Sequence, residues 1–258
     1  MPEQFIKFWR KFEHTTRPYI HRDDEAGMEM LEQRGLLDKT TRNVDAYVRR
    51  GLLGSKPNTT MHLNLMPVPY AGNIRTSKIV LLFSNPSLSC ADYFYEAKQD
   101  TPYWNAHLAT IRQTLGRRAY PFISLDPQFC WHSGFDYWEK RLRWIVQQLL
   151  AAEETSSPAY TYTDALREVS SNVAVIQLMP YRSRKFPGPA VRLPSCQAAR
   201  EFVDRISKEG DRLILPIRRA RDWRLKRDEP SNRAAWFTNR TNTRILQKLL
   251  EIRRKKNS

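Results

Sequence analysis

An asparagine followed by a proline, at residues 85 and 86, forms the motif in this sequence that is best suited to chemistry. An asparagine can hold a water molecule through its amide oxygen and donate a hydrogen bond through its amide nitrogen, and a following proline fixes the backbone that aims it. The pair ends the apolar run Ile79–Phe83, which indicates a buried strand. Asn before Pro is also a common turn former, so the motif alone is consistent with a plain turn.

Four apolar segments have the character of buried strands, and helical patterns separate them. They are residues 78–84, 120–125, 172–179 and 211–217. Strands that are apolar throughout and are separated by helices imply a parallel sheet covered on both faces. We therefore expect an α/β fold with three α/β/α layers around a central four-stranded, mainly parallel sheet.

The first part of the chain has a different pattern, with aromatic residues at helical spacing in residues 3–13 and a charged helical stretch over residues 23–53. We expect residues 1–65 to form a helical N-terminal extension and residues 66–258 to form the α/β domain. The Pro- and Gly-containing segment 66–73 is expected to be a loop that leads into the first strand.

Ligands of parallel α/β sheets bind beyond the carboxyl ends of the strands. This rule directs attention to four loops, residues 84–88, 126–132, 180–185 and 218–223, and all four are rich in polar, aromatic or basic side chains. Asp126 is the first acid in these loops and is followed only by Asp222. Asp126 is therefore a candidate catalytic group, although its Leu-Asp-Pro context also suits a turn residue.

The charge of the chain is strongly positive, at +16, and it is concentrated in the C-terminal third. Residues 182–258 hold 22 of the 43 Lys and Arg and only 8 of the 27 Asp and Glu, a net +14. A near-neutral body with a basic third favours a polyanionic partner, and the richness in arginine favours phosphate recognition. We expect a nucleic acid as the partner, with an acidic membrane surface or a merely solvated basic face as alternatives.

Several classes of protein are disfavoured by missing motifs. The three cysteines are far apart, which argues against a disulfide framework, a zinc site or an iron–sulfur cluster. Phosphate-binding glycine loops, HExxH and GxSxG are absent, and the five histidines do not have metal-ligand spacing. There is no signal-peptide pattern and no apolar run long enough to cross a bilayer. We expect a cytoplasmic protein without a metal or cofactor and without membrane association.

The segment MPVPYAGNIRTSKIVLLFSNPSLS, residues 66–89, resembles the entry segment of the uracil-DNA glycosylase superfamily, particularly its mismatch-specific and thymine-DNA glycosylase branch. There a Pro-rich loop and a Gly precede the first core strand, which ends in a Gly-x-Asn-Pro-Gly motif. Here that motif stands as Phe83-Ser84-Asn85-Pro86-Ser87, with both glycines replaced. The resemblance extends over residues 66–225 as an order of strands. It implies a DNA glycosylase in which Asn85 positions the attacking water.

The second signature of that family, a His-Pro-Ser or Asn-Pro-Ser loop after the last core strand, is missing. Residues 216–223 stand in its place, with three arginines at 218, 219 and 221. By resemblance this loop presses into the duplex and braces the phosphates, and one arginine could fill the space left by an extruded base. Either Arg218 or Asp126 could replace the assisting His or Asn of the family.

Excision of a base requires a flipped nucleotide and a pocket with a stacking aromatic side chain. For this base pocket we predict Ser84, Pro86, Ser87, Tyr93, Phe94 and Tyr181. For contacts to DNA we predict Arg182, Ser183, Arg192, Ser195, Arg218, Arg219 and Arg221. Ser195 is expected to cap the helix that begins there, where free backbone N–H groups can bind a phosphate.

The pattern as a whole is similar to that of diverged DNA glycosylases of bacterial antiphage defence. This resemblance implies excision of glucosylated hydroxymethylcytosine from phage DNA, leaving an abasic site. We expect a monofunctional enzyme, because no lysine in the four loops has an obvious Schiff-base setting. Two alternatives stay open: a non-catalytic nucleic-acid-binding domain in which Asn85 only turns the chain, and a nuclease with unrecognised carboxylates.

Overall fold

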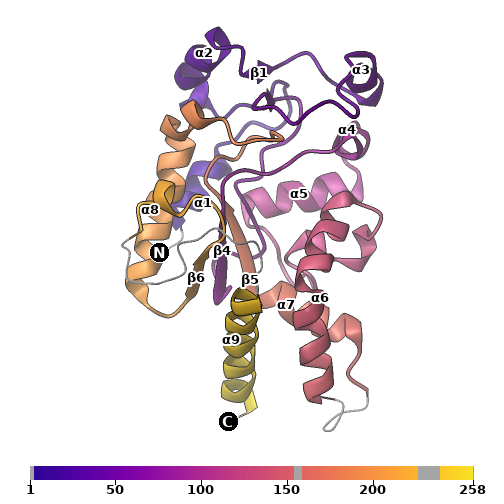
Figure 1. Cartoon of the computed structure of the whole chain (residues 1–258), viewed down its shortest axis with the longest axis vertical. Coiled ribbons are helices and arrows are strands. Elements are labelled where there is room, and N and C mark those ends of the chain that lie inside the picture. Colours follow the sequence, from indigo (N-terminus) through magenta and orange to yellow (C-terminus); the bar gives the residue numbers. More distant parts are fainter. Residues whose placement is uncertain (1–2, 154–158, 226–238, 258) are drawn as a thin grey trace.

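The computed structural model of the chain describes residues 3–153, 159–225 and 239–257. A four-stranded sheet lies at the centre, in the order β3-β5-β4-β6 (Figure 1). Strands β4 (Ile79–Phe83), β5 (Val173–Gln177) and β6 (Leu213–Pro216) are parallel, and β3 (Tyr70–Ala71) pairs antiparallel with β5. The expected four-stranded, mainly parallel sheet is thus confirmed, and it is mixed because of β3.

One of the four strand predictions, that for residues 120–125, is wrong. Within residues 120–125, Ile123–Leu125 form a short 3₁₀ helix, η2, and Phe122 donates its backbone N–H to the hydroxyl of Ser170 at 3.0 Å. Phe122 is nevertheless fully buried, so the apolar run reflects burial and not sheet pairing. The fourth strand of the sheet is β3, which lies in the segment expected to be a loop.

Alternating side chains of the strands point to two separate cores. Val80 and Leu82 face the layer formed by α1 (Glu3–Arg10), α5 (Pro102–Arg112) and α8 (Pro194–Glu209). Ile79, Leu81 and Phe83 face the layer formed by α6 (Ser133–Glu153), α7 (Tyr162–Asn172) and α9 (Asn239–Asn257). Helices therefore cover both faces of the sheet, as Figure 1 shows, and the three-layer arrangement is confirmed.

The N-terminal segment contains η1 (Arg22–Asp24), α2 (Glu25–Gln33), α3 (Val44–Arg49) and a pair of short parallel strands, β1 (Leu37–Asp38) and β2 (Met61–His62). Its first helix belongs to the main core. On α1, the ring of Phe5 lies 5.3 Å from that of Tyr70 and 5.2 Å from that of Phe202. The beginning of the expected N-terminal extension is therefore continuous with the hydrophobic core of the α/β layers.

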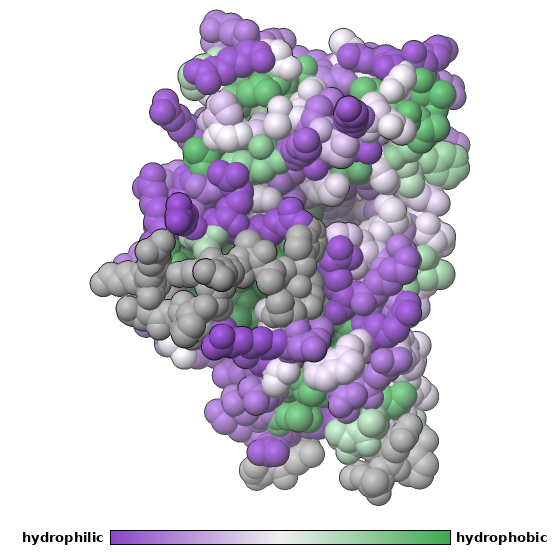
Figure 2. Space-filling model, in the orientation of Figure 1, coloured by the Kyte–Doolittle hydropathy of each residue, from purple (hydrophilic) through white to green (hydrophobic). Residues whose placement is uncertain are grey.

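The elements that remain are α4 (Cys90–Tyr95), η3 (Pro127–Phe129), η4 (Gly188–Arg192) and η5 (Ala220–Trp223). The face seen in Figure 2 is largely hydrophilic, with hydrophobic areas near α3 and α4. None of the helices in the described ranges combines the length and the apolar character needed to span a membrane.

Candidate functional site

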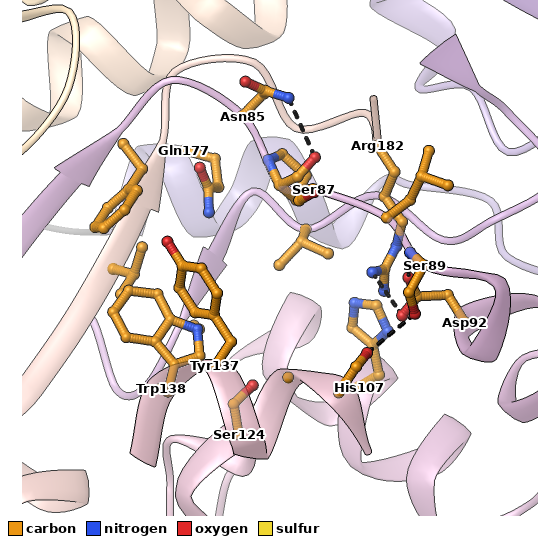
Figure 3. A pocket seen from close by; sticks show the side chains of 18 of the residues that line it. Asn85, Ser87, Ser89, Asp92, His107, Ser124, Tyr137, Trp138, Gln177 and Arg182 are labelled. Atoms are coloured by element: carbon orange, nitrogen blue, oxygen red, sulfur yellow. Dashed lines mark hydrogen bonds and ion pairs between the residues drawn. The ribbon is translucent and has the colours of Figure 1, made fainter. Parts of the chain in front are cut away.

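A cavity of about 390 Å³ lies beyond the carboxyl ends of β4 and β5 (Figure 3). Its walls come from the loops that follow these two strands, from α4 and α5, from η2 and from the first turns of α6. The carboxyl end of a parallel sheet is where the strand order leaves room for a ligand. The pocket thus lies where the strand pattern predicts a site.

Seven of the predicted site residues line this pocket together. They are Ser84, Asn85, Pro86, Ser87, Arg182, Ser183 and Arg218. The first four follow β4, the next two follow β5, and the last follows β6, so three neighbouring strand ends contribute. The convergence arises because parallel strands present their carboxyl ends at the same edge of the sheet.

Asn85 is held by hydrogen bonds to both neighbouring segments of the pocket wall. Its Nδ2 donates to the backbone oxygen of Ser183 at 2.7 Å and lies 3.0 Å from the Ser183 hydroxyl. Its Oδ1 accepts from the hydroxyl of Ser84 at 2.9 Å. An amide oxygen has two lone pairs, so Oδ1 retains the capacity to accept one further hydrogen bond.

One end of the pocket is lined by aromatic side chains that were not among the predicted site residues. Phe83 and Trp138 meet edge to face with ring centroids 5.3 Å apart, and Tyr137 lies beside Trp138 at 5.2 Å. Figure 3 shows Gln177 near Tyr137 and Trp138. Gln177 is only 8% exposed, and its Oε1 has no hydrogen-bond partner among the described residues. A buried polar atom without a partner is costly, so a ligand that supplies one gains affinity here.

The sequence does hold a signal for Gln177. It is the one polar residue inside the apolar run Val173–Met179, and it ends β5, next to the pocket. A polar residue that ends a fully buried strand is expected to have a partner or a ligand. Trp138 gives no such signal, because its spacing on α6 fits a core position equally well.

The other end of the pocket is charged. The guanidinium of Arg182 lies 3.2 Å from Asp92 Oδ1 and 2.6 Å from Glu96 Oε1, and all three side chains are buried. Burial by itself raises the pKa of Asp92, but Arg182 and His132 outweigh it and lower that pKa to about 2. The same balance of burial against Arg182 lowers the pKa of Glu96. The two carboxylates occupy the guanidinium of Arg182, so this geometry does not support its predicted contact with DNA.

Two histidines border the charged end. His132 accepts the backbone N–H of Gly134 at its Nδ1, at 2.9 Å, and its Nε2 lies 3.2 Å from Asp92 Oδ1. These contacts assign the proton of neutral His132 to Nε2. His107 on α5 is 3% exposed, and its Nδ1 lies 3.6 Å from Glu96 Oε1. His107 and His132 are missed by the sequence reasoning, which considers histidines only as metal ligands.

The aromatic residues predicted for the base pocket lie elsewhere. Tyr93 is buried, with its hydroxyl 2.6 Å from Nδ1 of His62, and Phe94 on the same helix is 67% exposed. Tyr181 is buried and donates its hydroxyl hydrogen to Asp24 Oδ2 at 2.6 Å. None of these three residues lines the pocket. Their positions do not support a role in this pocket, whose aromatic walls come from β4 and α6 instead.

Ser195 does not cap α8 and is not open to a phosphate. The helix begins at Pro194 with Leu193 as its N-cap residue, and Ser195 is 1% exposed. The backbone N–H of Ser195 donates to the buried Asp24 Oδ1 at 2.9 Å. A carboxylate of the chain thus occupies the end of the helix where the phosphate was expected.

Asp126 lies outside the pocket and is a turn residue. Its side chain accepts the backbone N–H of Gln128 at 3.0 Å and so caps η3. The predicted catalytic role is therefore not supported by its position, since it does not line the cavity.

The remaining arginines predicted for DNA contact lie on the surface. Arg192 and Arg221 are exposed, and Arg219 is paired with Asp222 while its guanidinium lies 4.3 Å from the centre of the Phe186 ring. These three residues do not line the pocket. Arg218, which does, is half-buried. The surface positions of Arg192, Arg219 and Arg221 are compatible with contact to a phosphate backbone outside the cavity.

Within the described ranges, no group of three or more His, Cys, Asp or Glu side chains is placed to hold a metal ion. The three cysteines are free. Comparisons with protein-family models, with curated proteins and with solved structures find no match to the chain.

Proposed function

We propose that this protein is a DNA glycosylase, which binds a flipped base in the pocket and hydrolyses its N-glycosidic bond. The observation that carries the proposal is the combination of three features in one cavity. They are the aromatic pair Phe83 and Trp138, the Gln177 amide oxygen, which has no partner among the described residues, and Asn85 at the adjoining strand end. Aromatic walls and a few convergent polar groups are the usual features of a site for a flat heterocycle.

The aromatic end suits the base. A nucleobase contributes a flat apolar face and a polar edge, and aromatic side chains pack against such faces while an amide pairs with the edge. The Gln177 amide offers both a donor and an acceptor, which matches an edge that carries both kinds of group. The cavity, at about 390 Å³, lies within the range of roughly 300–1,000 Å³ that is typical of ligand sites.

Asn85 is proposed to hold the attacking water through the remaining acceptor capacity of its Oδ1. The water oxygen bonds to C1′ of the sugar as the bond from C1′ to the base nitrogen breaks, and the electron pair leaves with the base. The proton of the water passes to solvent. The bonds from Nδ2 to Ser183 fix the amide before the substrate arrives, and such preorganisation is a main source of catalysis.

DNA is proposed as the substrate because of charge. The net charge of +16 favours a polyanion, and Arg218 and Arg184 line the pocket itself. The charged end provides polar groups beyond the aromatic end, which supports a base that carries a polar substituent. Glucosylated hydroxymethylcytosine, the base implied by the family resemblance, fits this description and is our proposed substrate.

The proposal is tested by incubating the protein with duplex DNAs that differ in one base. The panel holds cytosine, uracil, a thymine opposite guanine and glucosylated hydroxymethylcytosine, all in EDTA, and alkaline cleavage reveals abasic sites. We expect abasic sites with the glucosylated base and none with Asn85→Ala, whereas DNA affinity is retained by that variant. Binding to every DNA without release of any base would contradict the proposal.

A second candidate, a non-catalytic nucleic-acid-binding domain, is favoured by one observation. Both polar atoms of the Asn85 amide already have partners within the chain, as a residue that only shapes a loop would. In that case Asn85→Ala changes stability and DNA affinity together, and the panel yields no abasic sites. Strand breaks that require added metal and occur without alkali would instead indicate the nuclease.

A further inference from the structure

We infer that His107 is a specificity-determining residue, which accepts a hydrogen bond from an amino or hydroxyl group of the ligand at the charged end of the pocket. This inference rests on the proposed function, since it assigns a recognition role within the same cavity. His107 lies on α5, on the opposite side of the pocket from Gln177 in Figure 3, beside Asp92 and Arg182.

His107 is buried but unsatisfied. Its side chain is 3% exposed, and neither ring nitrogen has a hydrogen-bond partner among the described residues. Buried polar groups in native proteins nearly always have a partner, and the exceptions are concentrated where a ligand or a water binds. Since His107 lines the cavity, a bound ligand is the natural source of that partner.

The position of Glu96 determines which nitrogen is available. The Nδ1 atom of His107 lies 3.6 Å from Glu96 Oε1, and a lone pair facing a carboxylate at this distance is unfavourable. Neutral His107 therefore carries its proton on Nδ1. Glu96 cannot turn away, because Arg182 holds its Oε1 at 2.6 Å and the backbone N–H of Met66 donates to its Oε2 at 2.8 Å.

The Nε2 atom of His107 is thus a buried hydrogen-bond acceptor that has no partner among the described residues. Other polar groups at this end are already engaged. Asp92 and Arg182 pair with each other, Nδ1 of His132 accepts from Gly134, and the hydroxyl of Thr110 donates to the backbone oxygen of Ala106 at 2.9 Å. Nε2 of His132 has no hydrogen-bond partner within the described ranges, but it lies 3.2 Å from the Asp92 carboxylate and carries the proton, so it offers no acceptor. With Gln177 at the aromatic end, His107 makes the pocket selective for a ligand that has polar groups on two sides.

The first test reads the proton position directly. Nitrogen-15 NMR of the histidine rings in the free protein is expected to show His107 protonated at Nδ1 and unprotonated at Nε2. Glu96→Gln, which removes the carboxylate charge, is expected to shift this tautomer balance. A proton found on Nε2 in the wild type would overturn the inference whether or not the protein is an enzyme.

The second test reads selectivity with His107→Phe, which keeps a ring, and His107→Gln, which restores a polar atom near the place of Nε2. Single-turnover release is measured on two DNA pairs. The members of one pair, 5-hydroxymethylcytosine and 5-methylcytosine, differ by one hydroxyl donor; in the other pair, cytosine has an amino donor at C4 where uracil has a carbonyl acceptor. Binding of the same free bases is measured by calorimetry. We expect the wild type to prefer the donor-bearing member of at least one pair by tenfold or more.

The variants separate the two proposals. His107→Phe is expected to abolish the preference, His107→Gln to recover part of it, and His14→Phe, at a histidine outside the pocket, to leave it unchanged. A preference that survives in His107→Phe, or no preference in the wild type, overturns the role of His107. If the DNA that carries the glucosylated base also yields no abasic site, but the free bases bind with the expected preference, the proposed function fails and the recognition role of His107 stands.

Discussion

Asn85 and Ser183, which follow two neighbouring parallel strands, are joined within the pocket wall by a hydrogen bond of 2.7 Å from the Asn85 amide to the Ser183 backbone oxygen. This bond makes the end of β4 and the end of β5 a single wall. A residue expected from its sequence to align a water therefore also maintains the shape of the pocket. The two roles can be distinguished by experiment.

We predict that Asn85→Ala lowers the free energy of unfolding by about 1–2 kcal/mol, because the carbonyl and hydroxyl of Ser183 lose their donor. Base release is expected to fall by about 100-fold or more. Denaturant unfolding and single-turnover assays measure the two effects. Ser183→Ala is the control, since it removes only the hydroxyl contact and should retain most of the activity. Equal losses of activity in the two variants would assign Asn85 a shaping role alone.

Gln177→Met is predicted to lower activity without lowering stability. Replacing a buried amide whose oxygen has no partner by an apolar chain of similar shape leaves the free energy of unfolding unchanged or raises it by up to about 1 kcal/mol. Base release is expected to drop sharply, because the edge of the base loses its partner. Gln128→Met, at an exposed glutamine, should alter neither quantity. A clear destabilisation by Gln177→Met would show that the amide is satisfied in the free protein.

Arg182→Met is predicted to destabilise the fold by about 3–5 kcal/mol, because two buried carboxylates lose their counter-charge. Adding Asp92→Asn and Glu96→Gln to this variant should restore part of the loss. Thermal unfolding tests the expected order of stability, in which the wild type is the most stable, the triple variant is intermediate and Arg182→Met is the least stable. Arg184→Met, on the same loop, is the control and should lower stability far less. If Arg182 were instead a DNA contact, Arg182→Met would weaken DNA binding without a large loss of stability.

Stability is predicted to fall in acid through Asp92. Its pKa in the folded protein is about 2, against 3.8 when it is unperturbed. A depressed folded pKa contributes stability that is present above about pH 4 and is lost as the pH falls from about 4 to about 2. The contribution amounts to about 2 kcal/mol. Unfolding measured across this range should show a shallower acid limb in Asp92→Asn than in the wild type; identical slopes would contradict the ion pair.

Arg221→Gln is predicted to weaken DNA binding and to reduce the slope of log affinity against log salt by about 0.9, the value for one lost phosphate contact. Arg221 is exposed, whereas Arg219 is paired with Asp222 and stacked on Phe186, so Arg219→Gln should have the smaller effect. Fluorescence anisotropy at several salt concentrations provides the measurement. Arg49→Gln on α3 is the control. Unchanged slopes in all three variants would place the DNA on another face.

The three parallel strands could be predicted because each is an apolar run between helical patterns, and burial on both faces demands that composition. The convergence of Asn85, Ser183 and Arg218 followed from the same pattern. Strand β3 could not be predicted from the sequence, since a strand of two residues that pairs with the edge of a sheet is too short to show a pattern of alternating side chains. Residues 120–125 were wrongly predicted to form a strand, because burial under a helix selects the same apolar side chains as burial in a sheet.

The partners of buried polar side chains could not be predicted from the sequence for a different reason. Tyr181 meets Asp24 across 157 positions of the chain, and Arg182 meets Glu96 across 86. No local pattern records such a pairing, so both residues resembled free groups at a strand end. Gln177 could have been predicted as a site residue, because a polar side chain at the end of a buried strand indicates either a partner within the protein or a ligand.

The separation between Arg182 and its carboxylates also sets an order of assembly. While the chain is being synthesised, Asp92 and Glu96 emerge long before the guanidinium that lets them enter the interior. The wall formed by α4 is therefore expected to stay hydrated until the loop after β5 arrives. A nascent chain that ends before this loop cannot present a finished pocket, so binding requires that more than about seven tenths of the 258 residues have been made.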